Sequence, residues 1–210
     1  MIKQIWFGIV VIILMQSCVR DKLIQYPESM PYVYDVLIDA GHGGDDSGAQ
    51  SQSVLEKDLM LSLSQKLKKA LEHEGYRVYC TRSNDESIKL NERIAKMDSI
   101  EARLFISLHT NFSKDGNDNG INLYIRNQQQ SGPAAEAIQK ELTQASLMHF
   151  NKIEETSHFK ILNTPFPSVM LNLGYLSNES DLFILRNEEQ QTVLAQNISK
   201  AVKSYFQLHN

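Results

Sequence analysis

The stretch VLIDAGHGGDDSGA, residues 36–49, decides the fold, because an apolar run ends there in a glycine-rich turn that carries His42. Three aliphatic residues before Asp39 predict a β-strand that is buried on both faces. The glycines of the turn permit backbone angles that other residues resist. Open α/β sheets bind ligands beyond the carboxyl ends of their strands, so His42 is expected at the lip of a crevice. A structural histidine in a flexible turn is the alternative interpretation, and a phosphate loop is disfavoured because neither a Walker spacing nor a GxGxxG pattern is present.

Strands and helices alternate along the rest of the chain. Leu59, Leu63 and Leu67 recur at helical spacing, and Ser53 and Glu56 have the spacing of a capping box at the start of that helix. Periodicity predicts helices over 53–74, 88–101, 133–149 and 188–208, strands over 76–82, 103–110, 121–126 and 168–173, and an irregular polar segment over 150–165. Pro133 suits the first turn of its helix. The pattern predicts one α/β domain with a mostly parallel or mixed twisted sheet and helices on both faces.

Composition narrows the classes of function. The chain has 210 residues, of which 42% are hydrophobic and 22% are charged, as in an ordinary globular protein. Its formal net charge of −4 disfavours nucleic acid as a partner. Two cysteines exclude a disulfide framework, and Cys80, inside a predicted strand, is expected to be a buried free thiol. We expect a monomer.

The amino terminus has the pattern of an export signal. Residues 1–17 place a nearly continuous apolar run behind Lys3, and this run is about half of the roughly 20 residues that a membrane-spanning helix needs. Cys18 follows where a bacterial lipoprotein signal places its lipidated cysteine, and an ordinary cleaved signal is the alternative. Residues 18–31 then read as a tether and 32–210 as the folded domain. These features predict an exported, periplasmic or cell-envelope protein that a lipid on Cys18 would attach to the membrane.

Three polar residues occupy comparable places at the ends of elements. His42 follows the first strand, Glu56 opens the first helix and His109 closes the strand over 103–110. Two imidazoles and a carboxylate suit a catalytic zinc ion, but a non-haem iron centre uses the same residue types. Glu56 could instead serve only the capping box, and His109 could be a core histidine. The remaining histidines are interpreted as structural: His73, His149, His158 and His209.

Four motifs occur in one order: DAGHGGDDSGA (39–49), LEKDLMLSLSQKLKKALEHEGYRVYCTRSND (55–85), LNERIAKMDSIEARLFISLHTN (90–111) and PSVMLNLGYLSNESD (167–181). With them the chain resembles the zinc-dependent N-acetylmuramoyl-L-alanine amidases of the bacterial cell wall, the Amidase_3 family, over roughly residues 33–206. The resemblance implies that His42, Glu56 and His109 bind one Zn²⁺ ion. It also implies that the substrate is peptidoglycan, cleaved at the amide between N-acetylmuramic acid and L-alanine of the stem peptide.

The chain departs from the family at Asn172. The family has its general-base glutamate at the end of the last strand, in a pattern similar to LVExGFLSN, where this chain reads LNLGYLSN over 171–178. A carboxamide cannot accept a proton near neutral pH, and loss of a general base typically costs about 10²–10⁴-fold in rate. An impaired amidase that binds zinc and cell wall is therefore the alternative function. The carboxylates that could take over the role are Glu154, Glu155, Glu179 and Asp181.

Overall fold

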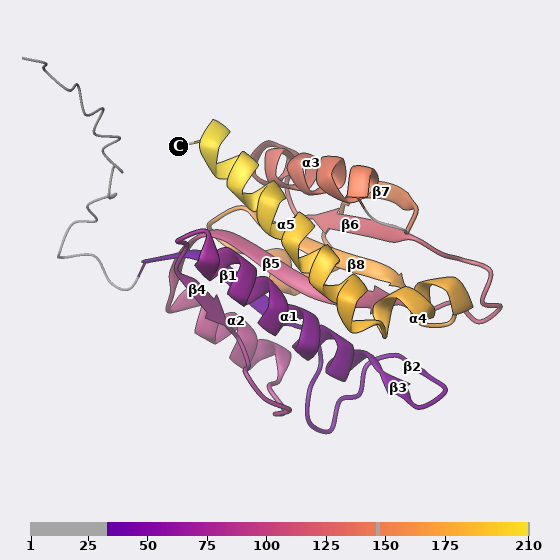
Figure 1. Ribbon diagram of the computed structural model, residues 1–210. Coiled ribbons are helices and arrows are strands. Elements are labelled where there is room, and N and C mark those ends of the chain that lie inside the picture. The colour runs from indigo at the N-terminus through magenta and orange to yellow at the C-terminus, as the bar shows by residue number, and fades with distance from the viewer. Residues whose placement is uncertain (1–32, 146–147, 210) are drawn as a thin grey trace, which may run out of the picture. The chain divides into compact units, whose positions relative to one another are not determined.

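A six-stranded mixed sheet forms the centre of the domain in the computed structural model, which describes residues 33–145 and 148–209 (Figure 1). The strand order is β4-β1-β5-β8-β6-β7. The strands are β1 Val33–Ala40, β4 Val78–Cys80, β5 Glu101–Asn111, β6 Ile121–Ile125, β7 Phe150–Glu155 and β8 Ser168–Tyr175. Neighbouring strands are parallel except β6 and β8, which pair antiparallel. A two-stranded hairpin of β2 Gln50–Ser51 and β3 Val54–Leu55 lies outside this sheet.

Both faces of the sheet are covered. The helices are α1 Glu56–His73, α2 Leu90–Asp98, α3 Gln128–Ala145, α4 Glu179–Leu185 and α5 Glu188–Leu208, with a 3₁₀ turn η1 at Lys160–Leu162. Val36 and Ile38 belong to the core under α1, α3 and α5, whereas Leu37 packs on the opposite face with residues of α2 and η1. Because successive side chains of a strand point to opposite faces, β1 needs apolar residues at all three positions. The predicted α/β class, mixed sheet and two covered faces are confirmed.

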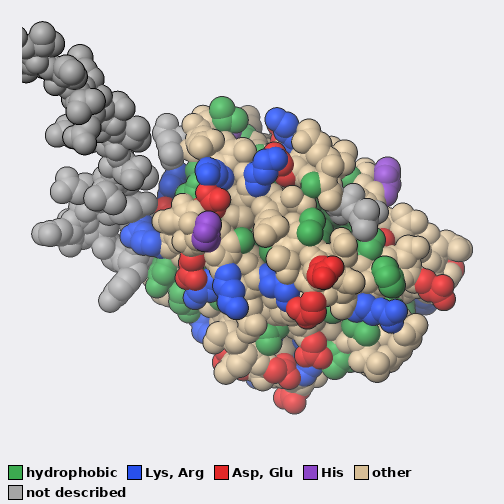
Figure 2. Space-filling view, viewed as in Figure 1, with side chains coloured by type: hydrophobic (Ala, Val, Ile, Leu, Met, Phe, Trp, Pro, Cys, Tyr) green, Lys and Arg blue, Asp and Glu red, His purple; other side chains and the backbone are tan. Residues whose placement is uncertain are grey.

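The helical face seen in Figure 2 carries intermixed basic and acidic side chains. Ion pairs link α1 to α5: Lys66 lies 2.6 Å from Glu188, and Lys203 lies 2.6 Å from Glu74 at the C-cap of α1. The opposite charges therefore neutralise one another locally on this face.

Several predicted boundaries were wrong. The segment over 150–165 is irregular only in part: Phe150–Glu155 forms edge strand β7, and half of its side chains are exposed, which explains its polar sequence. Residues 156–165 contain only the 3₁₀ turn η1. Pro133 lies inside α3 rather than in its first turn, because the helix begins at Gln128. Glu101 opens β5 instead of ending α2. The short elements β2, β3 and α4 were not predicted.

The predicted signal peptide (1–17), Cys18 and the tether (18–31) lie outside the described residues. Over residues 33–145 and 148–209, none of the helices combines the length and the apolar character needed to cross a membrane.

Candidate active site

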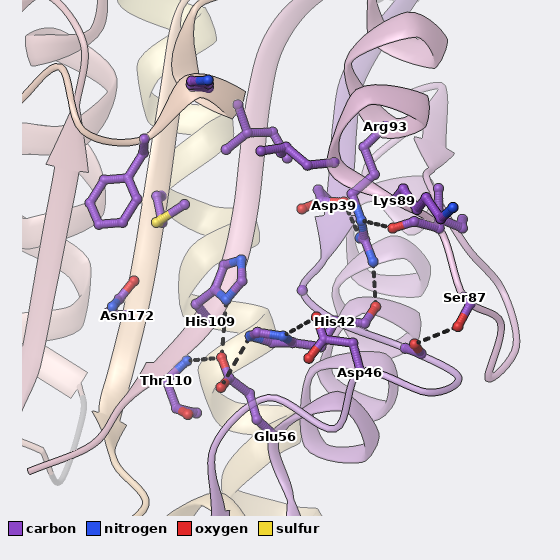
Figure 3. A pocket seen from close by; sticks show the side chains of 18 of the residues that line it. Asp39, His42, Asp46, Glu56, Ser87, Lys89, Arg93, His109, Thr110 and Asn172 are labelled. Atoms are coloured by element: carbon purple, nitrogen blue, oxygen red, sulfur yellow. Dashed lines mark hydrogen bonds and ion pairs between the residues drawn. The ribbon is translucent and has the colours of Figure 1, made fainter.

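The three candidate ligands come together at the carboxyl edge of the sheet. β1 and β5 are adjacent and parallel, and the amide of Gly41 donates to the carbonyl of Leu108 at 3.0 Å, so the chain leaves β1 beside the end of β5. His42 thereby reaches the side of His109. Glu56 is the first residue of α1, and its amide donates to the carbonyl of Ala49 at 2.9 Å. Figure 3 shows the three side chains pointing toward one another.

Glu56 bridges the two imidazoles. Its Oε2 lies 3.3 Å from His42 Nε2 and its Oε1 lies 3.0 Å from His109 Nδ1. The same carboxylate accepts hydrogen bonds from the backbone amides of Ala49 at 2.9 Å and Thr110 at 2.8 Å. The capping-box alternative for Glu56 is therefore wrong, because α1 has no side-chain cap and the carboxylate of Glu56 points into the site. Ligand atoms of the three residues lie within 4.8 Å of one another, which makes this a possible metal site.

His42 is held in an uncommon backbone conformation. Its φ is 59°, in the left-handed region that residues other than glycine rarely adopt. A reciprocal pair of backbone hydrogen bonds between Gly43 and Asp46, at 2.9 and 3.2 Å, closes the turn that follows. The Oδ2 atom of Asp46 lies 2.8 Å from His42 Nδ1, which fixes the ring and leaves Nε2 facing Glu56. Carboxylates in this position orient metal-binding histidines in many proteins.

Two glycines make room for the ligands. A Cβ atom on Gly41 would lie 2.4 Å from the His109 ring, and one on Gly48 would lie 2.6 Å from the His42 ring and 2.7 Å from Glu56 Oε2. Gly48 also has a φ of 64°, which disfavours other residues. The turn quoted from the sequence therefore needs glycine at both positions for the side chains to meet.

The charges of the site reinforce one another. Burial alone would raise the pKa of Glu56, but hydrogen bonds and charge interactions with His109 and His42 outweigh it and hold that pKa well below its ordinary value. For His42, burial acts to lower the pKa, and Glu56 and Asp46 together raise it. Glu56 is therefore ionised at neutral pH, which is the form that binds a cation.

Two buried arginines hold the backbone that carries His42. Arg93 donates to the carbonyls of Ala40, at 2.8 Å, and of His42, and it pairs with buried Asp39 at 2.6 Å. Arg82 donates to the carbonyls of Ala40 and Gly41, each at 2.9 Å. Asp39 also accepts hydrogen bonds from the hydroxyl groups of Thr81 and Ser107 at 2.7 and 3.0 Å. Its buried charge is therefore stabilised by two hydroxyl donors in addition to Arg93. Sequence reasoning missed these contacts, because residues 39, 82 and 93 are distant in the chain.

Asn172 lies level with His109 on the neighbouring strand β8. Its Nδ2 donates to Asn111 Oδ1 at 2.8 Å, while Asn172 Oδ1 and Asn111 Nδ2 are buried without a partner among the described residues. Unpaired buried polar atoms are uncommon and often mark functional sites. Asn172 therefore carries a buried, unpaired hydrogen-bond acceptor on the strand beside His109.

A cleft of about 1090 Å³ joins these residues. It is lined by His42, Glu56, His109 and Asn172 and extends to Lys89 and Arg93 on one side and to the segment from His158 to Ile161 on the other. His158 thus lines the cleft, and its Nδ1 contacts Thr156 Oγ1 at 3.0 Å.

None of the four carboxylates considered as substitutes for the missing base lines this cleft. Glu154 pairs with Lys152, and Glu155 accepts from the amide of Gln128 at 3.0 Å. Asp181 is buried and accepts from the amides of Gly120 and Tyr175 at 2.7 and 2.8 Å. Glu179 lies in the exposed first turn of α4.

A mixed sheet with a cleft at its carboxyl edge, and with two imidazoles and a buried carboxylate converging there, defines an α/β protein with a possible metal site. The profile of the N-acetylmuramoyl-L-alanine amidase family (Amidase_3) matches residues 36–204. The chain belongs to this family, and the predicted class of enzyme is confirmed at that level.

Individual relatives agree with the family assignment. The uncharacterized protein YqiI of Bacillus subtilis is 34% identical over 174 residues, with 81% of this chain and 84% of YqiI covered. The probable cell wall amidase LytH of Staphylococcus epidermidis is 33% identical over 175 residues, and the match spans 58% of LytH. The catalytic domain of CwlV, an N-acetylmuramoyl-L-alanine amidase from Bacillus (Paenibacillus) polymyxa var. colistinus, superposes with a TM-score of 0.77 at 31% identity, covering 84% of this chain and 98% of that domain.

Proposed function

We propose that the chain is a zinc-dependent peptidoglycan hydrolase that cleaves the amide between N-acetylmuramic acid and L-alanine of the stem peptide. The observation that carries this proposal is the convergence of His42, Glu56 and His109 in the cleft of a domain that belongs to the amidase family. Three protein ligands of these types leave one position of a tetrahedral zinc ion for water or substrate.

The residues present fit a zinc ion in chemistry and in space. Both histidines offer a ring nitrogen toward Glu56, and Asp46 fixes the ring of His42 from behind. A zinc ion bound there supplies Lewis-acid polarisation of the scissile carbonyl and a water that is nucleophilic near neutral pH. Iron uses similar ligand sets, so metal analysis of the purified protein is part of the test.

Asn172 is proposed to orient the reacting groups without accepting a proton. Asn172 lines the cleft, and its Oδ1 is buried without a partner among the described residues. A turn of the side chain, which Asn111 now holds through Nδ2, would present Oδ1 to water or to the scissile amide. Since a carboxamide does not take up a proton near neutral pH, the proton of the attacking water would pass to solvent, and the departing amine would take its proton from solvent. We therefore propose slow hydrolysis.

The experiment uses the zinc-loaded protein and purified peptidoglycan, and it counts released stem peptides that have a free L-alanine amino terminus. Asn172→Glu should raise the rate by about 10²–10⁴-fold, because it adds a general base. Asn111 Nδ2, which has no partner among the described residues, can turn to donate to the new carboxylate. If neither the wild-type protein nor Asn172→Glu releases stem peptides, the hydrolase proposal is wrong.

A second candidate, a zinc-containing cell-wall binding protein without turnover, is favoured by one observation: Asn172 stands in the cleft and none of the considered carboxylates joins it there. Sedimentation with purified sacculi separates the two. Binding of the wild-type protein without stem-peptide release, together with release by Asn172→Glu, would support this second candidate.

Export and lipid attachment through Cys18 are proposed from the sequence of residues 1–18 alone. Labelling cells with a fatty-acid analogue should mark the wild-type protein and leave Cys18→Ser unmarked. Equal labelling of both proteins would overturn the lipid anchor and leave the hydrolase proposal untouched.

A further inference from the structure

The cleft continues beyond the metal site along the α2 and η1 face of the sheet. Asp39, Ser107 and Met170 form a row across three strands, and this row lies two residues back from His109 and Asn172. Two residues of a strand span about 7 Å. We define the distal end of the cleft as Lys89, Leu90, His158, Phe159, Lys160 and Met170, all of which line it.

Phe159 and Ile161 form one wall of the distal end. They are held there because they pack with Met170 in the smaller core cluster. The other wall is the start of α2, which Arg93 ties to Asp39 at 2.6 Å. In Figure 3, Lys89 stands on the α2 side of the cleft, away from Glu56. Both walls are therefore attached to the row of Asp39, Ser107 and Met170: one through Met170 and the other through Asp39.

The two ends of the cleft differ in charge. Its carboxylates are Asp39, Asp45, Asp46 and Glu56, and they are either paired with Arg93 or His42 or lie at the metal end. Among the described residues, the distal end has no carboxylate but carries the ammonium groups of Lys89 and Lys160. Neither ammonium group has a carboxylate partner among the described residues, in contrast to Lys57, which pairs with Asp85 at 2.7 Å.

The positive charge of the distal end matches the stem-peptide half of the proposed substrate. On the sugar side of the scissile amide lies a neutral N-acetylated sugar, and on the other side lies a stem peptide that carries carboxylates. An extended peptide advances about 3.3–3.6 Å per residue, so the residue after L-alanine reaches a point about 7 Å from the scissile bond, at the level of Met170.

We propose that Lys89 and Lys160 bind the free carboxylate of the second stem-peptide residue, with the peptide lying over Asn172 and Met170. This inference rests on the proposed function, because it takes the scissile amide to be at the metal site. Both lysines are exposed, and exposed ion pairs contribute modestly, so each should change affinity by about two- to five-fold.

The experiment compares two probes, N-acetylmuramoyl-L-alanyl-D-isoglutamate and the same compound with the second carboxylate converted to a carboxamide. Calorimetry gives Kd and amine release gives kcat/KM for each. The wild-type protein should prefer the free acid by about ten-fold, and added salt should reduce this preference. The double variant Lys89→Gln/Lys160→Gln should reduce it to about two-fold or less. The matched control Lys114→Gln/Lys140→Gln removes two exposed lysines outside the cleft and should keep the wild-type preference.

The two proposals fail in distinguishable ways. Equal use of both probes by the wild-type protein, or an undiminished preference in the cleft double variant, would overturn the carboxylate site while hydrolysis itself stands. If neither probe is cleaved but the Kd preference is present and is lost only in the cleft double variant, the carboxylate site is supported and the hydrolase proposal fails.

Discussion

At the scale of single residues, the contacts of His42 decide whether zinc is held. His42 and His109 each direct one ring nitrogen to Glu56, so His42→Ala and His109→Ala should each abolish stoichiometric zinc. Asp46→Asn should weaken zinc affinity by about 10–100-fold, because it loosens the ring without removing a ligand. Metal analysis after dialysis and chelator competition measure both effects. The control is His73→Ala, an exposed residue of α1; stoichiometric zinc in both ligand variants would refute the site.

Cys80 gives a second prediction at this scale. Burial raises the pKa of its thiol to about 11. Since only the thiolate reacts, about one molecule in a thousand is reactive at pH 8, compared with roughly a quarter for an ordinary thiol of pKa 8.5. In Cys18→Ser protein, alkylation at pH 8 should therefore be more than a hundred-fold slower in the folded than in the urea-unfolded state. Equal rates in the two states would show that Cys80 is not shielded.

The sequence singles out the three candidate ligands, which the structure brings together, because each lies near the end of a strongly periodic element. His42 follows apolar strand β1, His109 lies near the end of β5, and Glu56 begins an amphipathic helix. It does not predict Asp46 as the partner of His42, because that contact depends on a left-handed backbone at His42 itself. Position 172 is singled out only by resemblance to the family. Its hydrogen bond with Asn111 joins two strands that are distant in sequence, next to a register shift in β5 that the local pattern does not indicate.

At the scale of elements, the local sequence pattern predicts the central strands of the sheet and misses the edge strand and the short helix. β1, β5 and β8 are buried on both faces and therefore read as apolar runs, whereas edge strand β7 is half exposed and reads as polar loop. α4 is too short for a helical period to emerge, although Asn178 caps it through Ser180 and Asp181. Tertiary contacts, rather than local preference, fix these pieces.

The link between β1 and α2 is the ion pair of Asp39 with Arg93, and it yields a prediction for the packing of these elements. Arg93→Met leaves the Asp39 charge buried and unpaired, so the free energy of unfolding should fall by about 3–5 kcal/mol. The double variant Asp39→Asn/Arg93→Met should recover part of this loss, because the uncompensated charge is gone. Urea unfolding of the wild-type protein, Arg93→Met, Asp39→Asn and the double variant measures the free energy of unfolding of each. A loss below about 1 kcal/mol in Arg93→Met would mean that the pair does not join the two elements energetically.

At the scale of the whole molecule, the proposed zinc ligands lie on β5, α1 and the turn after β1, so zinc binding should stabilise the entire domain. A ligand that binds only the folded state at 100 times its Kd adds about 2.7 kcal/mol, which for a domain of this size corresponds to a rise in Tm of about 5–10 °C. Calorimetry with and without zinc should show this rise in the wild-type protein. Asn172→Glu should show the same rise, because residue 172 is not among the ligands, while His109→Ala should show none. An equal rise in His109→Ala would place the stabilising ion elsewhere, since the remaining pair, His42 and Glu56, lacks the third ligand that couples the ion to β5.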